Sequence, residues 1–317
     1  MMRSYLSKAA FLCCFLGVAS ILAAAQPPEN GKPQVRTVTI PISIFTRQEL
    51  KEKKAEEIID AAELSVIEDK EPQQILSLRS TNDAPITLAI LIQDEVTSSF
   101  NLQLKPIADF IKRLPEGSRV MVGYLRGGSL GIRQHFTKDL VKAADSLRVV
   151  SGSSAFAGTG PYAGVVSAVK RFEAMPAGRR AILVVSDGFD ATEGEAPGSV
   201  LHAPDLERAI ARAQRAGIAV YSFYFPTGLT ENSTIRSIAG QAGLDRLAHE
   251  TGGNSYSQGS GVPVTLQPFF DDIETALRRQ FSLTYLSTHM EKGYHRVEVK
   301  SSNPEVTIRH PQGYYYR

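Results

Sequence analysis

Short apolar runs that stop at acidic residues organise the middle of the chain. The run from Leu88 to Ile92 belongs to the segment 85–100 and ends at Asp94. The runs 180–185 and 218–225 have the same character, and the first of them ends at Ser186-Asp187-Gly188. Runs this short and this rich in aliphatic residues are typical of strands buried on both faces of a parallel sheet. In open sheets of this kind, ligands bind just past the carboxyl ends of the strands.

Segments with helical spacing separate these strands. Apolar residues recur with helical spacing over 101–114, and the same pattern predicts helices near 140–147, 161–172, 205–216, 244–249 and 273–277. We expect Asp205 to cap one of them and Gly217 to end it. The segments 119–125 and 132–136 predict a hairpin across Gly127–Gly131. The fold class that this order indicates is α/β, with a doubly wound, mostly parallel sheet over 83–280.

Both ends of the chain have a different pattern. Alternating apolar residues predict strands at 35–45, 64–67 and 74–78, and again at 281–286, 294–299 and 306–310. Strands at both ends of an α/β block indicate that 35–82 and 281–317 pair into one small β-rich module, into which the α/β domain is inserted. The charged stretch 48–60 predicts a solvated helix or an ordered loop.

The first 25 residues have the pattern of a secretory signal peptide. Arg3 and Lys8 precede an apolar stretch over 9–22, and Ala23-Ala-Ala25 follows it. A membrane anchor is the alternative, but spanning a bilayer takes about 20 apolar residues and this run is shorter. Residues 26–34 then form a leader rich in proline and glycine. We expect a secreted or periplasmic protein with no stable membrane insertion after cleavage.

Composition narrows the classes of partner and chemistry. Cleavage after residue 25 would remove the two cysteines, Cys13 and Cys14, so that a disulfide or a thiolate metal site is excluded in the mature chain. It would also lower the count of basic residues from 35 to 33, against 33 acids. A near-neutral chain gives no indication of nucleic-acid binding.

Three landmarks follow one another along the α/β segment: Asp94 with its nearby hydroxyls, Thr159 in a Ser/Gly-rich loop, and Ser186-Asp187-Gly188. In this order they resemble the von Willebrand factor type A domain, whose metal-ion-dependent adhesion site combines an Asp-x-Ser-x-Ser loop with a Thr and an Asp. Four further segments resemble the VWFA-related proteins described from Acidobacteria: Leu64-Ser-Val-Ile-Glu-Asp-Lys-Glu-Pro-Gln-Gln-Ile75, Ala248-His-Glu-Thr-Gly-Gly253, Phe281-Ser-Leu-Thr-Tyr285 and Gln312-Gly-Tyr-Tyr315.

This resemblance implies a domain that binds a divalent cation and, through it, an acidic group of a protein partner. Carried over residue by residue, the metal ligands are Asp94, Ser98, Thr159 and Asp187, and the ion is Mg²⁺, or Mn²⁺ or Ca²⁺. A Mg²⁺ ion takes about six oxygen ligands and often keeps several waters, which leaves a position for an outside carboxylate. The expected function is therefore protein binding or adhesion.

One residue departs from the family pattern. Val96 stands where the first serine of the loop is expected, and valine offers no oxygen to a cation. A register shifted by one residue restores three oxygens with Glu95, Thr97 and Ser99, although a glutamate is longer by one methylene. We prefer the register of Asp94, in which the site is degenerate and binds metal weakly.

Structural roles also account for several of these residues. Asp94 and Asp187 can accept backbone N–H groups at the strand ends, and Ser98 and Ser99 can cap the helix 101–114. We expect Asp190 to be a solvent-exposed acidic residue in a loop. His289 and His295 flank a predicted turn and could approach each other, but histidines in such a place are usually at the surface.

Enzyme signatures are weak in this sequence. Gly127-Gly-Ser129-Leu-Gly131 matches Gly-x-Ser-x-Gly, but a nucleophile elbow turns from a strand into a helix, and a strand is predicted next. No His-Glu-x-x-His motif and no phosphate-binding glycine loop occurs. We therefore predict an exported, non-enzymatic binding protein. The alternative is a structural or assembly protein that binds its partner by strand addition to the terminal β module.

Overall fold

The computed structural model describes residues 34–46, 63–81, 84–152, 158–193, 203–259 and 261–316. The predicted signal peptide, most of the leader and the charged stretch 48–60 lie outside these residues. The chain divides into two compact units, 1–34 and 35–317, and everything below concerns the second unit. Among the described residues, no helix combines the length and the apolar character needed to cross a membrane.

Two sheets account for the strands, and helices belong to the central block. The strands are β1 Arg36–Thr46, β2 Leu64–Glu68, β3 Glu71–Ser80, β4 Ile86–Gln93, β5 Arg119–Arg126, β6 Ser129–Thr137, β7 Arg179–Ser186, β8 Ala219–Tyr224, β9 Ser255–Tyr256, β10 Gln280–Ser287, β11 Gly293–Ser301, β12 Val306–Arg309 and β13 Gly313–Tyr316. The α-helices are α2 Leu104–Lys112, α3 Leu140–Asp145, α4 Tyr162–Arg171, α5 Pro204–Ala216, α6 Gly228–Glu231, α7 Thr234–Thr251 and α8 Gln267–Arg278, with short 3₁₀ helices at η1 Ser98–Gln103, η3 Phe172–Ala174 and η4 Ala191–Glu193.

The central sheet has six strands in the order β6-β5-β4-β7-β8-β9. Strand β4 pairs in parallel with β5 and β7, and the strand order reverses on either side of it. All eight residues of β4 are buried, because neighbours flank it and helices cover both faces. Only β6 runs antiparallel, as the second arm of the hairpin with β5. This is the doubly wound α/β fold that the sequence predicts.

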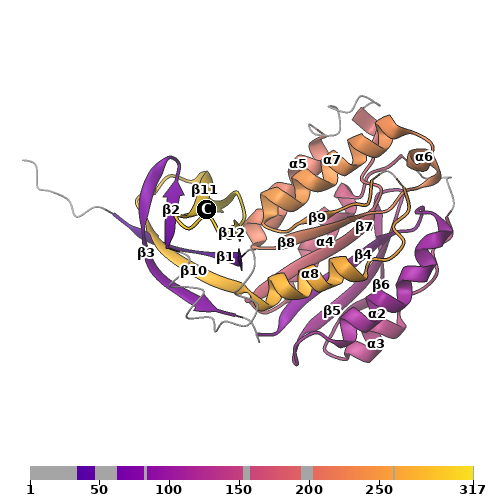
Figure 1. Ribbon diagram of the computed structural model, residues 1–317, viewed down its shortest axis with the longest axis horizontal. Coiled ribbons are helices and arrows are strands. Elements are labelled where there is room, and N and C mark those ends of the chain that lie inside the picture. Colours follow the sequence, from indigo (N-terminus) through magenta and orange to yellow (C-terminus); the bar gives the residue numbers. More distant parts are fainter. Residues whose placement is uncertain are drawn as a thin grey trace, which may run out of the picture. The chain divides into compact units, whose positions relative to one another are not determined.

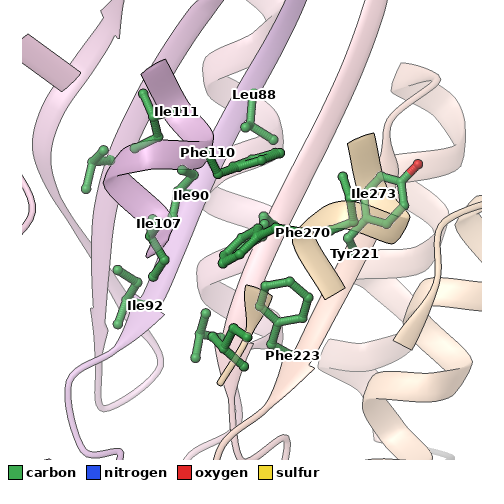
Figure 2. Packing of buried hydrophobic residues seen from close by; sticks show 14 of the residues in the cluster. Leu88, Ile90, Ile92, Ile107, Phe110, Ile111, Tyr221, Phe223, Phe270 and Ile273 are labelled. Carbon is green, nitrogen blue, oxygen red and sulfur yellow. The ribbon is translucent and has the colours of Figure 1, made fainter. Parts of the chain in front are cut away.

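Alternate residues of β4 contribute to two separate hydrophobic cores. Leu88, Ile90 and Ile92 pack with helices α2, α3 and α8, and Figure 2 shows this layer with Phe110 and Phe270 between the strands and the helices. Ala89 and Leu91 face the other core, together with apolar residues of α4, α5 and α7. This two-sided burial is why the sequence shows a continuous apolar run and no alternation.

The second sheet combines both ends of unit 35–317. Its seven strands follow the order β12-β1-β10-β3-β2-β11-β13, so that strands from the start and from the end of the unit are interleaved in it (Figure 1). All of its pairings are antiparallel, and β10 is central, between β1 and β3. A third core, in which Ile42 and Leu283 are buried, lies against this sheet. The Arg36 guanidinium of β1 stacks on the ring of Tyr316 in β13, so the sheet curls until these two strands meet.

Arg179 connects the two sheets. It is the first residue of β7, and its side chain donates to Oε1 of Gln280 in β10 at 2.7 Å. It also donates to the carbonyl oxygens of Ala84 and Leu277. A planar guanidinium can satisfy several acceptors at once, so this one side chain serves the sheet, the helix before β10 and the chain before β4.

The predicted glycine ends of α5 and α7 are correct, whereas the predicted starts of α5 and of the helix at 101–114 are not. Gly217 and Gly252 adopt left-handed conformations, with φ of 61° and 84°, and end α5 and α7. Helix α5 begins at Pro204 after Ala203, so Asp205 lies in the first turn and is not the cap. The helix predicted at 101–114 begins instead as a 3₁₀ turn at Ser98, and Thr97 precedes it. Ser98 and Ser99 are therefore inside the turn, and the prediction that they cap the helix is wrong.

The Gly-x-Ser-x-Gly segment is a tight hairpin. Gly127 and Gly128 have φ of 52° and 71°, as a two-residue turn between β5 and β6 requires. Ser129 is the first residue of β6 and is exposed. This is the hairpin that the sequence predicts, with a shorter turn.

Helix α7 passes unusually close to the end of β7. A Cβ atom at Gly240 would lie 1.9 Å from the Asp187 carbonyl oxygen, which is part of the backbone and cannot rotate away. We expect Gly240→Ala to lower the free energy of unfolding by about 3 kcal/mol or more, because the helix must shift. Urea unfolding of both proteins measures this difference. Gly228→Ala is the matched control, since a Cβ there meets nothing within 4 Å. Equal losses in the two variants would contradict the close packing.

Candidate functional site

The predicted acids lie at the carboxyl ends of two neighbouring strands. Ile92 of β4 is aligned with Val185 of β7, so the residues that follow, Asp94 and Asp187, leave the sheet side by side. Both residues are buried, with 6% and 0% of their surface exposed. A buried carboxylate is costly unless donors or a cation satisfy it. The groups around these two carboxylates therefore decide what the site can bind.

Asp94 is paired with an arginine. Nη1 of Arg148 lies 2.7 Å from Oδ1 of Asp94, and the guanidinium stacks at 3.9 Å on the ring of Tyr124. The Tyr124 hydroxyl in turn donates to the carbonyl oxygen of Arg148 and accepts from its N–H. The hydrogen bond to Asp94 raises the pKa of Arg148, so the positive charge is fixed. A guanidinium thus lies on the carboxylate that the sequence predicts as the first metal ligand.

Asp187 is satisfied by a threonine and a backbone amide. Thr227 Oγ1 donates to Oδ2 at 2.7 Å, and the N–H of Phe189 donates to Oδ1 at 3.2 Å. Complete burial raises the pKa of Asp187 from 3.8 to about 6, although these two hydrogen bonds act in the opposite direction. Asp187 therefore accepts a backbone N–H, as its structural interpretation predicts.

Gln93 links the two strand ends. Its Oε1 accepts hydrogen bonds from Ser186 Oγ at 2.6 Å and from the N–H of Asp187 at 3.1 Å. The amide orientation is set by the Asp187 N–H, which needs an acceptor, so Nε2 points the other way. Nε2 is buried and has no hydrogen-bond partner among the described residues. An N–H donor at this position favours an oxygen atom as its neighbour and not a cation.

The remaining predicted ligands, Ser98 and Thr159, have other surroundings, and so has Val96. Val96 is fully buried and forms an isolated bridge with Thr227. Ser98 is exposed on the first turn of η1. Thr159 is half-buried, and its methyl group faces Gly128.

The alternative register is also satisfied by protein atoms. Glu95 is buried, and its Oε1 accepts the N–H of Gly127 at 3.1 Å. Burial raises the pKa of Glu95, and the negative charge of Asp94 adds to this effect. The hydroxyls of Thr97 and Ser99 bond to each other at 2.9 Å. These hydroxyls have a partner without an ion.

The donor set at this edge does not fit a divalent cation in the described arrangement. Such an ion needs about six oxygens around one point. Here Asp94 faces a guanidinium, Asp187 faces a hydroxyl and an N–H, and Val96 contributes no oxygen. Metal binding by Asp94, Ser98, Thr159 and Asp187 stays a prediction, and the geometry favours Arg148 as the positive charge of the site.

An open cleft of about 840 Å³ lies beside Asp94. The end of β4, the β5–β6 hairpin and the loop after α3 line it. Its charged side chains are Arg126, Arg133, Arg148 and Asp94. Three guanidinium groups around one carboxylate give the cleft a positive excess, and guanidinium groups bind carboxylates through paired N–H···O bonds.

Three residues of the site, Thr227, Gln93 and Arg148, were not predicted from the sequence. Thr227 follows the third buried strand, so the rule that ligands gather at strand ends could have found it. Gln93 interrupts the apolar run directly before Asp94, which is a visible signal. Arg148 follows α3 without any motif, and no pattern in the sequence relates it to Asp94.

Asp190 corrects another expectation. It is 3% exposed and is not a solvated loop acid. Its Oδ1 accepts from the N–H and the hydroxyl of Thr192, at 3.0 and 2.6 Å. Gly160 packs directly against it, since a Cβ there would lie 2.9 Å from Oδ2. The loop after β7 is therefore held inward by its own side chains.

Among solved structures, several resemble this chain in the course of the backbone. A von Willebrand factor type A protein from Catenulispora acidiphila matches 74% of this chain and 71% of its own, with 10% identity and a TM-score of 0.42. BatB from Bacteroides thetaiotaomicron matches 61% and 96%, with 16% identity and a TM-score of 0.43. The SpRpn10 VWA domain matches 59% and 94%, with 14% identity and a TM-score of 0.40.

These similarities are too low to assign a ligand or a partner. No family model matches the chain, and no curated protein matches it. The site must therefore be interpreted from its own geometry.

The raised pKa of Asp187 predicts a pH-dependent stability. Because the folded-state pKa of about 6 exceeds the ordinary 3.8, folding favours the protonated acid, and stability falls as pH rises through this window. Asp187→Asn keeps the two hydrogen bonds and removes the charge. We expect this variant to gain up to about 3 kcal/mol over the original chain between about pH 4 and pH 7. Urea unfolding across this range measures it, and a pH-independent difference would contradict the prediction.

Proposed function

We propose that this chain is an exported, non-enzymatic binding protein whose α/β domain captures an acidic segment of a protein partner at the carboxyl edge of the central sheet. The observation that carries the proposal is the Arg148 guanidinium on Asp94, at the mouth of a cleft with two further arginines. In this arrangement the guanidinium takes the role that a cation has in the metal-ion-dependent site that the sequence resembles.

The chemistry of the cleft supports a carboxylate as the bound group. Arg148 is held on two sides, by the ring of Tyr124 and by Asp94, and so loses little freedom on binding. Arg126 and Arg133 lie on the two arms of the β5–β6 hairpin, which rests on a tight turn and is a rigid support. Two neighbouring strands that each carry an arginine suit the binding of an extended acidic peptide.

Several observations support a binding role over catalysis. Ser129 lies in β6, so the Gly-x-Ser-x-Gly segment lacks the strand-to-helix turn of a nucleophile elbow. The basic, apolar and small-residue sections of residues 1–25 support export. A divalent ion, Mg²⁺, Mn²⁺ or Ca²⁺, at Asp94, Ser98, Thr159 and Asp187 is the competing way to attract an acidic partner.

Binding by strand addition to the seven-stranded sheet has less support. Its edge strands, β12 and β13, have four residues each, and short edges offer few free backbone groups. Arg36 of β1 also stacks on Tyr316 of β13 across the curl of the sheet.

An acidic peptide tests the cleft directly. We expect a fluorescein-labelled octaglutamate to bind the chain, and we expect Arg133→Gln to weaken this binding about 3–10-fold, the effect of losing one partly exposed charge pair. Fluorescence anisotropy at low ionic strength measures the affinity. Arg171→Gln, an exposed arginine at the end of α4, is the matched control and should bind as the original chain does. Equal weakening in both variants would indicate nonspecific charge attraction and would overturn the proposal.

Metal dependence separates the two ways of attracting an acid. We expect the octaglutamate affinity to be the same in EDTA and in millimolar Mg²⁺, because Arg148 already supplies the positive charge. Calorimetric titration of Mg²⁺ into the chain and into Asp187→Ala should show no site-specific heat in either. Peptide binding that requires the ion, together with an isotherm lost in Asp187→Ala, would restore the metal-ion-dependent interpretation.

A further inference from the structure

A second group of titratable side chains lies far from the cleft, within the seven-stranded sheet. Glu68 is the last residue of β2 and is fully buried. Asp69 follows it in the β2–β3 turn, and His289 comes from the connection between β10 and β11. His295 of β11, the histidine expected at the surface, is only 4% exposed and lies with its ring centroid 5.9 Å from that of His289.

The two oxygens of Glu68 have different surroundings. Oε1 accepts from Ser287 Oγ at 2.9 Å and from the Tyr314 hydroxyl at 2.6 Å. It also faces Arg36 Nη2 at 3.5 Å. Oε2 is equally buried and has no hydrogen-bond partner among the described residues. A buried carboxylate oxygen without a donor is costly, so this position favours a proton donor or a cation as its neighbour. The chain's own candidate donor is the buried hydroxyl of Tyr285, whose pKa is raised by burial and raised further by Glu68.

His289 presents a second unsatisfied atom to Glu68, on the side of Oε1. Its Nδ1 is buried without a hydrogen-bond partner and lies 3.8 Å from Oε1 of Glu68, too far for a shared proton. Its Nε2 lies 3.6 Å from Oε2 of Glu71, which favours the proton on that nitrogen and leaves the Nδ1 lone pair toward Glu68. The backbone of His289 is held as well, because its carbonyl oxygen accepts from Arg36 Nε and its N–H donates to Ser287.

Asp69 completes the group and is firmly positioned. The β2–β3 turn places it at φ of 48°, a conformation that aspartate tolerates in tight turns. Its Oδ1 accepts the N–H of Arg296 at 2.9 Å, and its Oδ2 lies 2.8 Å from Nδ1 of His295. One ligand atom each from Glu68, Asp69 and His289 lie within 4.8 Å of one another. Two carboxylates and one imidazole thus surround a single point.

We propose that Glu68, Asp69 and His289 bind one divalent transition-metal ion, of which Zn²⁺ is the representative. Nδ1 of His289 lies 3.8 Å from Oε1 of Glu68 with no hydrogen bond between them, and an imidazole nitrogen and a carboxylate this close can share such an ion. The nitrogen ligand favours Zn²⁺ over Mg²⁺ or Ca²⁺, which prefer oxygen alone.

The distances and charges agree with this site. Ligand atoms of a tetrahedral ion at bond lengths near 2.1 Å are about 3.4 Å apart, so a spread of 4.8 Å closes by side-chain rotation. Glu68, Asp69 and Glu71 place three carboxylates at this end of the hairpin, and Arg36 balances one of them. His295 orients Asp69 through the 2.8 Å contact, in the manner of residues behind a metal ligand.

Such an ion would join segments from opposite ends of the chain. Glu68 and Asp69 belong to the β2–β3 hairpin, whereas His289 belongs to the C-terminal strands. The proposal does not depend on the acidic-peptide function, because the ligands and the cleft share no residue.

Zinc titration tests the proposal. The full chain, with Cys13 and Cys14 replaced by serine so that no thiolate competes, is freed of metal with EDTA and titrated calorimetrically. We expect one Zn²⁺ site with a micromolar or lower dissociation constant, and a rise in melting temperature with Zn²⁺. His289→Ala should weaken binding at least about 100-fold, more than the 10–100-fold typical of a residue behind the ligands. Glu68→Gln, which keeps the shape of the side chain, should weaken it as well.

His249→Ala is the matched control, since His249 is an exposed histidine 3.2 Å from Asp245. It should bind Zn²⁺ as the parent does. Circular dichroism of each metal-free variant shows whether it folds. Zinc affinity that is equal in the parent and in folded His289→Ala, or binding weaker than millimolar in the parent, would overturn the site. Loss of stability in His289→Ala with no effect of Zn²⁺ on either protein would do the same, because it would identify a simple ion pair between His289 and Glu68.

Discussion

A carboxylate taken out of water needs a partner, and in this protein that requirement arises wherever a buried strand ends in an acid. Asp94 follows β4, Asp187 follows β7, and Glu68 ends β2, and each is almost completely buried. Arg148 forms an ion pair with Asp94, and the Thr227 hydroxyl donates a hydrogen bond to Asp187. The hydroxyl groups of Ser287 and Tyr314 donate to one carboxylate oxygen of Glu68. The three carboxylates have different partners within the chain, and these partners determine what each place in the structure can bind.

At the carboxyl edge of the central sheet, groups of the chain itself satisfy both buried carboxylates. The parallel pairing of β4 with β7, and of β7 with β8, brings together residues that are separated by 40 to more than 90 positions, as the Thr227–Asp187 and Gln93–Ser186 hydrogen bonds show. Once Arg148 lies on Asp94, the edge resembles a metal-ion-dependent site in its position, but its positive charge is covalently part of the chain. A guanidinium is permanently charged and directional, so it can select a planar acid without depending on the supply of an ion.

In the seven-stranded sheet, the described residues satisfy one of the two carboxylate oxygens of Glu68. Among the described residues, Oε2 of Glu68 and Nδ1 of His289 are both buried without a hydrogen-bond partner, although the neighbouring backbone is held by several hydrogen bonds. Order around an unsatisfied pair is what a preorganised ligand site requires. The same sheet unites the two ends of unit 35–317, and Arg179 joins it to the central sheet, so a ligand here would act on the connection between the termini.

The hydrophobic pattern of the sequence by itself determined the buried strands, the hairpin at Gly127–Gly128 and the helix ends at Gly217 and Gly252, because burial period and left-handed glycines are local properties. It also located Asp94 and Asp187 at the carboxyl edge of the central sheet. Only the tertiary structure decided that Arg148 lies on Asp94, that Asp190 and His295 are buried, and that Glu68 faces His289. The Arg148–Asp94 and Glu68–His289 contacts join positions that are 54 and more than 200 residues apart, and the partner of a buried charge is set by how the elements pack, which no local period encodes.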